Sequence, residues 1–128
     1  MSYHFSKTID VPFDQAVSRV TEALKREGFG VLTDIDVAAT MKAKLGEYFR
    51  PYRILGACNP QLAHRALQLE DKIGTMLPCN VIVQQHESGG VEVSAVDPVA
   101  SMQAIDNPGL ADVATEVRAK LRRVVEGL

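Results

Sequence analysis

The spacing of apolar residues in the first quarter of the chain predicts a strand, a helix and a second strand. Residues 3–11 alternate loosely between apolar and polar side chains, as expected of a strand with one buried face. From 12 to 27, apolar residues recur at intervals of three and four, which is the spacing of one helix face packed against a core. Gly28 is a suitable end for this helix, because glycine adopts the left-handed conformation without a steric penalty. The segment 29–34, FGVLTD, then predicts a short strand.

The next pattern predicts a brief helix followed by a strand with little polar character. Asp36 can cap the helix, and Gly46 can close it as Gly28 closes the first one. Residues 52–58, YRILGAC, are too apolar for a strand with one face in solvent. We therefore expect this segment to be a buried central strand.

Two helices are predicted to begin at the same Asn-Pro pair. Asparagine is a good N-cap, and proline suits the first helical position, where its missing N–H is not needed. Asn59 and Pro60 begin a predicted helix over 60–70. The pair recurs at 107–108, before a long helix over 108–126 that has one continuous apolar stripe.

Between these helices the pattern predicts an antiparallel hairpin. Residues 79–86 and 91–96 are strand-like, and the Ser-Gly-Gly turn at 88–90 separates them. Asp-Pro at 97–98 stops the second strand, and the segment 99–105 fits a single helical turn. This hairpin is the firmest strand pairing that the sequence gives.

The predicted order of elements is β-α-β-α-β-α-β-β-α, within one domain spanning residues 1–128. A length of 128 residues is close to the commonest domain size. Because hairpin and crossover connections are mixed in this order, we expect an α/β (α+β) fold. Its architecture would be a two-layer sandwich, in which helices back a mixed sheet of about five strands.

The net charge and the hydropathy of the chain argue against nucleic acids and membranes as binding partners. A net charge of -2 gives no long-range field that would attract nucleic acid or an anionic membrane. No apolar run approaches the ~18 residues that a membrane span needs, and the first residues do not resemble a signal peptide. We therefore expect a cytoplasmic protein whose two cysteines are thiols.

Several long phrases of the sequence resemble one protein family. These phrases are FGVLTDIDV, YRILGACNP, LPCNVIV and the VDP that precedes the last long helix. Together they resemble the family called domain of unknown function 302, over nearly the whole chain. The resemblance implies a compact α/β fold and, from structurally known relatives, a homodimer. It implies no activity.

Cys58 and Cys79, each followed by asparagine, are the candidate reactive residues. Because Cys58 precedes the N-cap Asn59, its sulfur could lie near the positive end of the following helix, which favours thiolate. The functional interpretation is a reactive or ligand-binding cysteine, with Cys79 beside it. The alternative is that both are small apolar residues of the core, since cysteine is among the most buried residue types.

The sequence gives little support to a metal, a cofactor or a catalytic pair. Cys58 and Cys79 could be joined by His4, His64 or His86, but no C-x-x-C or H-x-x-x-H spacing is present. A Cys58–His64 nucleophile pair would have no evident third residue to orient it. The glycine pair of the chain lies in the hairpin turn and not before a helix, so no phosphate loop is indicated. We predict no metal and no cofactor, and we leave open whether the protein is an enzyme.

A basic stretch before the apolar strand is a second candidate site. Arg53 and Tyr52 follow a run of cationic and aromatic side chains, namely Lys42, Lys44, Tyr48 and Arg50, with Glu47 among them. A cleft lined in this way could hold a small anion, whereas a solvated face that keeps the protein soluble is the plainer explanation.

Three functional hypotheses follow. The first is a small-ligand or anion-binding homodimer whose binding residues are Cys58, Asn59, Arg53, Cys79 and Tyr52. The second is a thiol-based redox or transfer protein with Cys58 as nucleophile and Cys79 as resolving thiol. The third is a structural or interaction dimer without a ligand. We rank them in that order.

Overall fold

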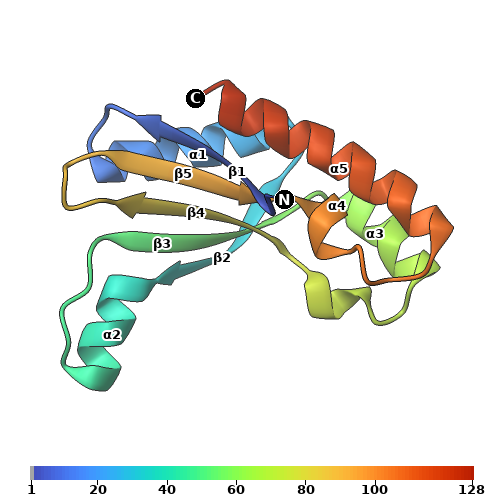
Figure 1. Cartoon of the computed structure of the whole chain (residues 1–128), viewed down its shortest axis with the longest axis horizontal. Coiled ribbons are helices and arrows are strands. Elements are labelled where there is room, and N and C mark those ends of the chain that lie inside the picture. The colour runs from blue at the N-terminus through green and yellow to red at the C-terminus, as the bar shows by residue number, and fades with distance from the viewer. Residues whose placement is uncertain (1) are drawn as a thin grey trace.

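The computed structural model describes residues 2–128 and contains one open five-stranded sheet (Figure 1). The strands are β1 (His4–Ile9), β2 (Gly30–Asp36), β3 (Tyr52–Cys58), β4 (Cys79–Gln85) and β5 (Val91–Val96). Their order across the sheet is β1-β5-β4-β3-β2, and each neighbouring pair is antiparallel. The predicted α+β architecture is confirmed, including the hairpin between β4 and β5.

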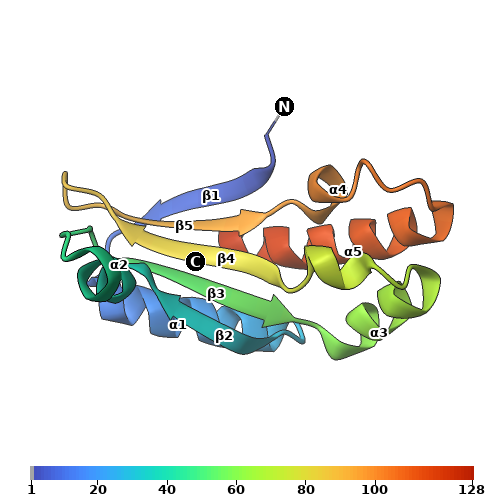
Figure 2. The same cartoon turned by 90° about the horizontal axis from the view of Figure 1, so that it is seen from below.

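The helices lie on one face of the sheet and at its two ends. They are α1 (Phe13–Arg26), α2 (Val37–Leu45), α3 (Pro60–Leu69), α4 (Pro98–Ser101) and α5 (Pro108–Glu126), with the short 3-10 helix η1 (Ile73–Met76). Helices α1 and α5 cover one face, while the other face stays open (Figures 1 and 2). Helix α2 projects from one end of the sheet, and α3, η1 and α4 gather at the other. None of the helices within residues 2–128 combines the length and apolarity that a membrane crossing requires.

The sheet differs in one respect from the mixed sheet that the order of elements predicts. The α1 crossover does join two strands that run in the same direction, β1 and β2, but they lie at opposite edges with three strands between them. Helices α2 and α3 instead connect neighbouring antiparallel strands. Strands β1 and β2 run in the same direction but are not hydrogen-bonded to each other. Every neighbouring pair of strands in the sheet is antiparallel.

β3 is also less central and less buried than its composition predicts. It is the fourth strand in the order, and β4 occupies the centre of the sheet. Leu55 is fully buried under the helices, whereas Tyr52, Arg53 and Ile54 are only half-buried. The reason is that one face of the sheet has no helix over it.

The hydrophobic core lies between the sheet and helices α1 and α5. Leu24 of α1 and Leu121 of α5 are fully buried there against Val83 and Val93 of the central strands. Burying side chains of this size stabilises the fold by about 1.5–3 kcal/mol each. This core fixes α5 in place, and α5 in turn forms one wall of the cavity described next.

Candidate functional site

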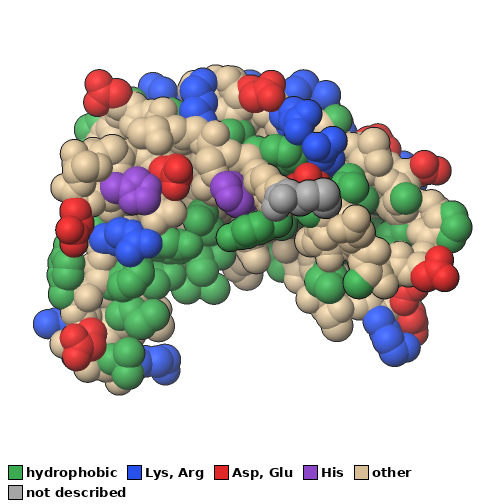
Figure 3. All heavy atoms as spheres, in the orientation of Figure 1, with side chains coloured by type: hydrophobic (Ala, Val, Ile, Leu, Met, Phe, Trp, Pro, Cys, Tyr) green, Lys and Arg blue, Asp and Glu red, His purple; other side chains and the backbone are tan. Residues whose placement is uncertain are grey.

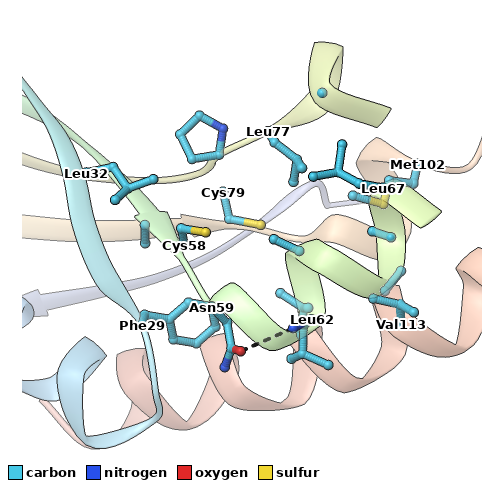
Figure 4. A pocket seen from close by; sticks show the side chains of 17 residues that line it. Phe29, Leu32, Cys58, Asn59, Leu62, Leu67, Leu77, Cys79, Met102 and Val113 are labelled. Carbon is cyan, nitrogen blue, oxygen red and sulfur yellow. Dashed lines mark hydrogen bonds between the residues drawn. The ribbon is translucent and has the colours of Figure 1, made fainter. Parts of the chain in front are cut away.

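An apolar cavity of about 340 Å³ lies at the end of the sheet where β3 finishes and β4 begins (Figure 4). Its walls come from the ends of these two strands and from α3, α5, η1 and the first residues of β2. The labelled lining residues in Figure 4 are Phe29, Leu32, Cys58, Asn59, Leu62, Leu67, Leu77, Cys79, Met102 and Val113. None of the described residues that line it is charged.

The Asn-Pro pair after β3 turns the chain into the helical wall of the cavity. The Asn59 side chain accepts a hydrogen bond from the Leu62 N–H at 3.4 Å, and Pro60 occupies the first helical position. The Asn59 amide also donates to the Glu27 carbonyl at 3.5 Å. Gly28 makes this approach possible, because its φ is +86° and a Cβ there would lie 3.0 Å from the Asn59 amide nitrogen.

Gly56 permits a close approach of three chain segments next to the cavity. A Cβ at this position would lie 2.1 Å from Thr33 Oγ1 and 2.7 Å from Pro78 Cγ. Only glycine therefore fits between β2 and the segment that leads into β4. Pro78 itself lines the cavity, so Gly56 helps to fix the cavity wall.

The two cysteines line the same cavity as free thiols. Cys79 pairs in register with Ala57, the residue before Cys58, so the two cysteines are neighbours across adjacent antiparallel strands. Cys79 is 8% exposed, and Cys58 is half-buried. Burial raises the pKa of Cys79 from 9.0 to about 11, with a smaller contribution from the charge of Cys58. Cys79 is therefore a protonated thiol at neutral pH.

The structure divides the five predicted binding residues between the two ends of β3. Cys58, Asn59 and Cys79 line the cavity. Tyr52 and Arg53 are at the opposite end of the strand and do not contribute to it.

At that opposite end, each side chain has a local partner. Arg53 forms two hydrogen bonds with Asp34, one of them from Nε to Oδ1 at 2.7 Å, and this pairing lowers the pKa of the Asp34 carboxyl. The Tyr52 ring packs edge-on against Phe49, with centroids 6.0 Å apart, and the Arg50 guanidinium lies over both rings. The cationic charge that would attract an anion to Arg53 is thus already balanced.

Most of the cavity lining was not among the residues predicted from sequence. Phe29, Leu62, Met102 and Val113 come from four separate segments and have no chemical motif. In the sequence they are indistinguishable from core residues, because an apolar cavity wall and a filled core use the same side chains. The usable signals were the two Cys-Asn pairs, one at the end of β3 and one at the start of β4.

The histidines considered as metal ligands are apart from the cysteines. His4 contacts Ser6 through Nδ1 at 2.7 Å, and His86 lies 3.2 Å from a carboxylate oxygen of Glu92. His64 is exposed on α3. Within residues 2–128, no group of three or more His, Cys, Asp or Glu side chains is placed to hold a metal ion.

Fold and cavity together define a small α+β domain with a preformed apolar cavity at one end of an antiparallel sheet. The chain belongs to the family domain of unknown function DUF302, whose sequence model matches residues 5–128. It is similar to the crystal structure of an uncharacterised conserved DUF302 protein from Bacillus stearothermophilus. The two share 28% sequence identity, with a TM-score of 0.91 over 98% of each chain. A comparison with curated proteins finds no match.

Proposed function

We propose that the protein binds a small, uncharged, apolar molecule in the cavity beside Cys58 and Cys79. The observation that carries this proposal is the cavity itself, whose volume of about 340 Å³ is within the range of small-molecule sites. Apart from Asn59 and the two thiols, its walls present apolar side chains or glycine. Such a wall stabilises an apolar ligand by removing its surface from water.

The lining also argues against a charged ligand. Moving an ion into an apolar cavity costs several kcal/mol unless a counter-charge or several hydrogen bonds receive it. The described lining has no charged side chain, and the Asn59 carbonyl oxygen already accepts from α3. Anion binding at Arg53 gains no support, because Asp34 already pairs with that guanidinium.

The cavity is accessible from the surface. Leu32 on β2 and Leu67 on α3 both line it, and they are 68% and 46% exposed. These two leucines are therefore at its mouth, while buried residues such as Leu62 form its inner wall. A ligand could enter between them without unfolding the domain.

Displacement of a fluorescent apolar probe tests this proposal. 1-Aminoanthracene is uncharged and small enough for the cavity, and its emission rises when it leaves water. We expect saturable binding and a concentration-dependent rise in Tm. Ala63→Leu, which fills part of the cavity from α3, should weaken probe binding at least ten-fold, whereas Ala119→Leu on the exposed side of α5 should not. Equal binding by both variants would show that the probe sits elsewhere.

We also propose that the protein is a homodimer, joined through the open face of the sheet. Ile35, Ile54 and Ile82 pair in register across β2, β3 and β4, and they form an apolar row on that face. Figure 3 shows hydrophobic side chains gathered in the hollow between α2 and the lobe formed by α3 and η1. Exposed apolar patches of this kind mark interaction sites.

Helix α2 gives a second reason for a partner copy. It has nine residues and no buried side chain, and Leu45 at its end is 67% exposed. A helix this short is marginal without packing. Its last turn carries Lys42 and Lys44, while Glu70 and Asp71 lie in the opposite lobe. A two-fold partner could place the basic end of one copy near the acidic lobe of the other.

The oligomeric state tests the dimer proposal. Light scattering after size exclusion should give twice the monomer mass of 14.0 kDa. Ile35→Glu introduces a charge into the apolar row at an exposed position and should produce monomers. Gln15→Glu adds the same charge on the exposed side of α1 and should remain a dimer. A monomeric wild type, or a dimeric Ile35→Glu, would contradict this interface.

Thiol chemistry is the second candidate function, because both sulfurs line one cavity. In this alternative, Cys58 must be the attacking group, since burial keeps Cys79 protonated. Because its raised pKa leaves Cys79 almost entirely protonated at neutral pH, we rank thiol chemistry below ligand binding. The cytoplasmic location expected from the sequence stays a prediction.

A further inference from the structure

A second cleft, of about 460 Å³, lies at the edge of the sheet beside the start of β1. It is bounded by β1, by the junction between β5 and α4, and by α5. Unlike the cavity at the cysteines, it has charged side chains in its lining. Arg118 and Arg122 project into it from α5, and Figure 3 shows Lys and Arg side chains gathered over that helix.

Both arginines are held against one aromatic ring. The guanidinium carbon of Arg118 lies 5.5 Å from the centroid of Phe5, and that of Arg122 lies 4.7 Å from it. The two residues are one helical turn apart, where like charges repel by a few tenths of a kcal/mol. Stacking on Phe5 offsets this repulsion and restricts the motion of two otherwise flexible side chains.

Among the described residues, the two arginines of the cleft are balanced unequally by acidic groups. Asp97 is 7% exposed, and its Oδ1 accepts hydrogen bonds from two backbone N–H groups in the first turn of α4, at 3.0 and 3.5 Å. Its Oδ2 accepts from Arg118 Nε at 3.1 Å. Arg122 Nε lies 3.9 Å from a carboxylate oxygen of Glu126, beyond hydrogen-bond distance, and that side chain is 70% exposed. Among the described residues, the charge of Arg122 is therefore only loosely balanced, by a solvent-exposed carboxylate without a hydrogen bond.

We propose that this cleft binds an oxyanion, a carboxylate or phosphate group on a small molecule, between Arg118 and Arg122. A guanidinium presents a rigid fork of N–H donors that matches the two oxygens of such a group. The anion would also relieve the repulsion between the two arginines. This site is separate from the apolar cavity, and it does not depend on the ligand proposed there.

Titration of the isotopically labelled protein with inorganic phosphate, and separately with acetate, tests the proposal. Sodium chloride keeps the ionic strength constant, and the Nε–H signals of the arginines report contact. We expect saturable shifts at Arg118 and Arg122 with at least one of the two anions, and the tighter one identifies the oxyanion class. Arg122→Gln should weaken binding about ten-fold or more, as expected for loss of a charge-assisted hydrogen bond.

Arg65→Gln is the matched control, because Arg65 is an exposed arginine on α3 that pairs with Glu116. It should bind the anion as the wild type does. Arg122→Lys keeps the charge without the fork and should recover only part of the affinity. The proposal would be wrong if the shifts were linear and did not saturate, or if Arg65→Gln lost as much affinity as Arg122→Gln. Either result would mean that anion binding depends only on the overall charge of the protein. The amide spectrum of each variant verifies that it is folded.

Discussion

The buried thiol of Cys79 gives a sharp test of the cavity wall, because its pKa changes on unfolding. In the folded protein burial raises this pKa from 9.0 to about 11. At pH 8 the thiolate fraction would be about 9% in the unfolded chain and about 0.1% in the folded protein. Since the thiolate is the nucleophile, the lower thiolate fraction alone should slow the reaction of native Cys79 with iodoacetamide roughly 100-fold, and the greater nucleophilicity of a more basic thiolate offsets about ten-fold of this. Burial of the sulfur slows the reaction further.

The same pKa shift makes stability depend on pH in the alkaline range. Above pH 9 the unfolded chain loses the Cys79 proton, while the folded protein keeps it until about pH 11. The unfolded state then binds fewer protons, so the free energy of unfolding falls as pH rises through this window, by roughly 2–3 kcal/mol in total. Below pH 9 the contribution is fully present.

Two measurements examine this reasoning. Alkylation is followed by mass spectrometry on wild type and on Cys58→Ala, so that the rate at Cys79 is seen alone. Urea unfolding at pH 8 and pH 10.5 is compared between wild type and Cys79→Ala, which lacks the titrating group. The difference between the two proteins should shrink at the higher pH. If native Cys79 reacts as fast as it does in urea, the sulfur is not buried as described.

Two further predictions concern residues beside the cavity, one within β3 and one at the start of α3. Gly56→Ala should destabilise the protein by several kcal/mol in urea unfolding, because the new Cβ would overlap Thr33 and Pro78. Gly30→Ala is the control, because a Cβ at position 30 would have no neighbouring atom within 4 Å. It should change the free energy of unfolding by less than about 1 kcal/mol. Asn59→Ala should lower the free energy of unfolding by about 1 kcal/mol through loss of the α3 cap, and Asn59→Asp should restore only part of it, because aspartate keeps the cap acceptor but cannot donate to the Glu27 carbonyl. A neutral Gly56→Ala, or an Asn59→Asp no better than alanine, would contradict these local geometries.

The elements of the fold were largely readable from sequence because their signals are local. The bounds of β3 and α5, and the caps at Asp36 and Gly46, agree with the patterns that predicted them. Strand order was not readable, since the crossover through α1 spans the whole sheet and its length does not say how many strands it passes. The two-layer arrangement was expected, but the partial exposure of β3 was missed, because whether Ile54 is covered depends on where helices from elsewhere in the chain pack.

The candidate site was only partly predictable. Cys58 and Asn59 were found through the Asn-Pro junction, whose capping role is now visible in the bond to the Leu62 N–H. The second such junction shows the limit of motif reasoning. The Asn107 side chain makes no cap hydrogen bond to its own helix and instead donates to the Leu69 carbonyl at 2.8 Å. The asparagine of an Asn-Pro pair therefore has a different role at each of the two helix starts. The Asn-Pro pair predicts where the helix begins, whereas the hydrogen-bond partner of the asparagine side chain depends on which residues pack beside it in the fold.

Ligand binding and thiol chemistry share one cavity, so each can report on the other. A molecule seated against the wall formed by Leu62 and Cys79 must also cover part of the half-buried Cys58. Saturating 1-aminoanthracene should therefore slow alkylation of Cys58 by about the ratio of bound to free protein. In Ala63→Leu, which we expect to bind the probe at least ten-fold more weakly, the same concentration should slow the reaction much less. If the probe binds tightly and Cys58 still reacts at its original rate, the ligand lies outside this cavity, and the apolar-ligand proposal fails even though binding is real.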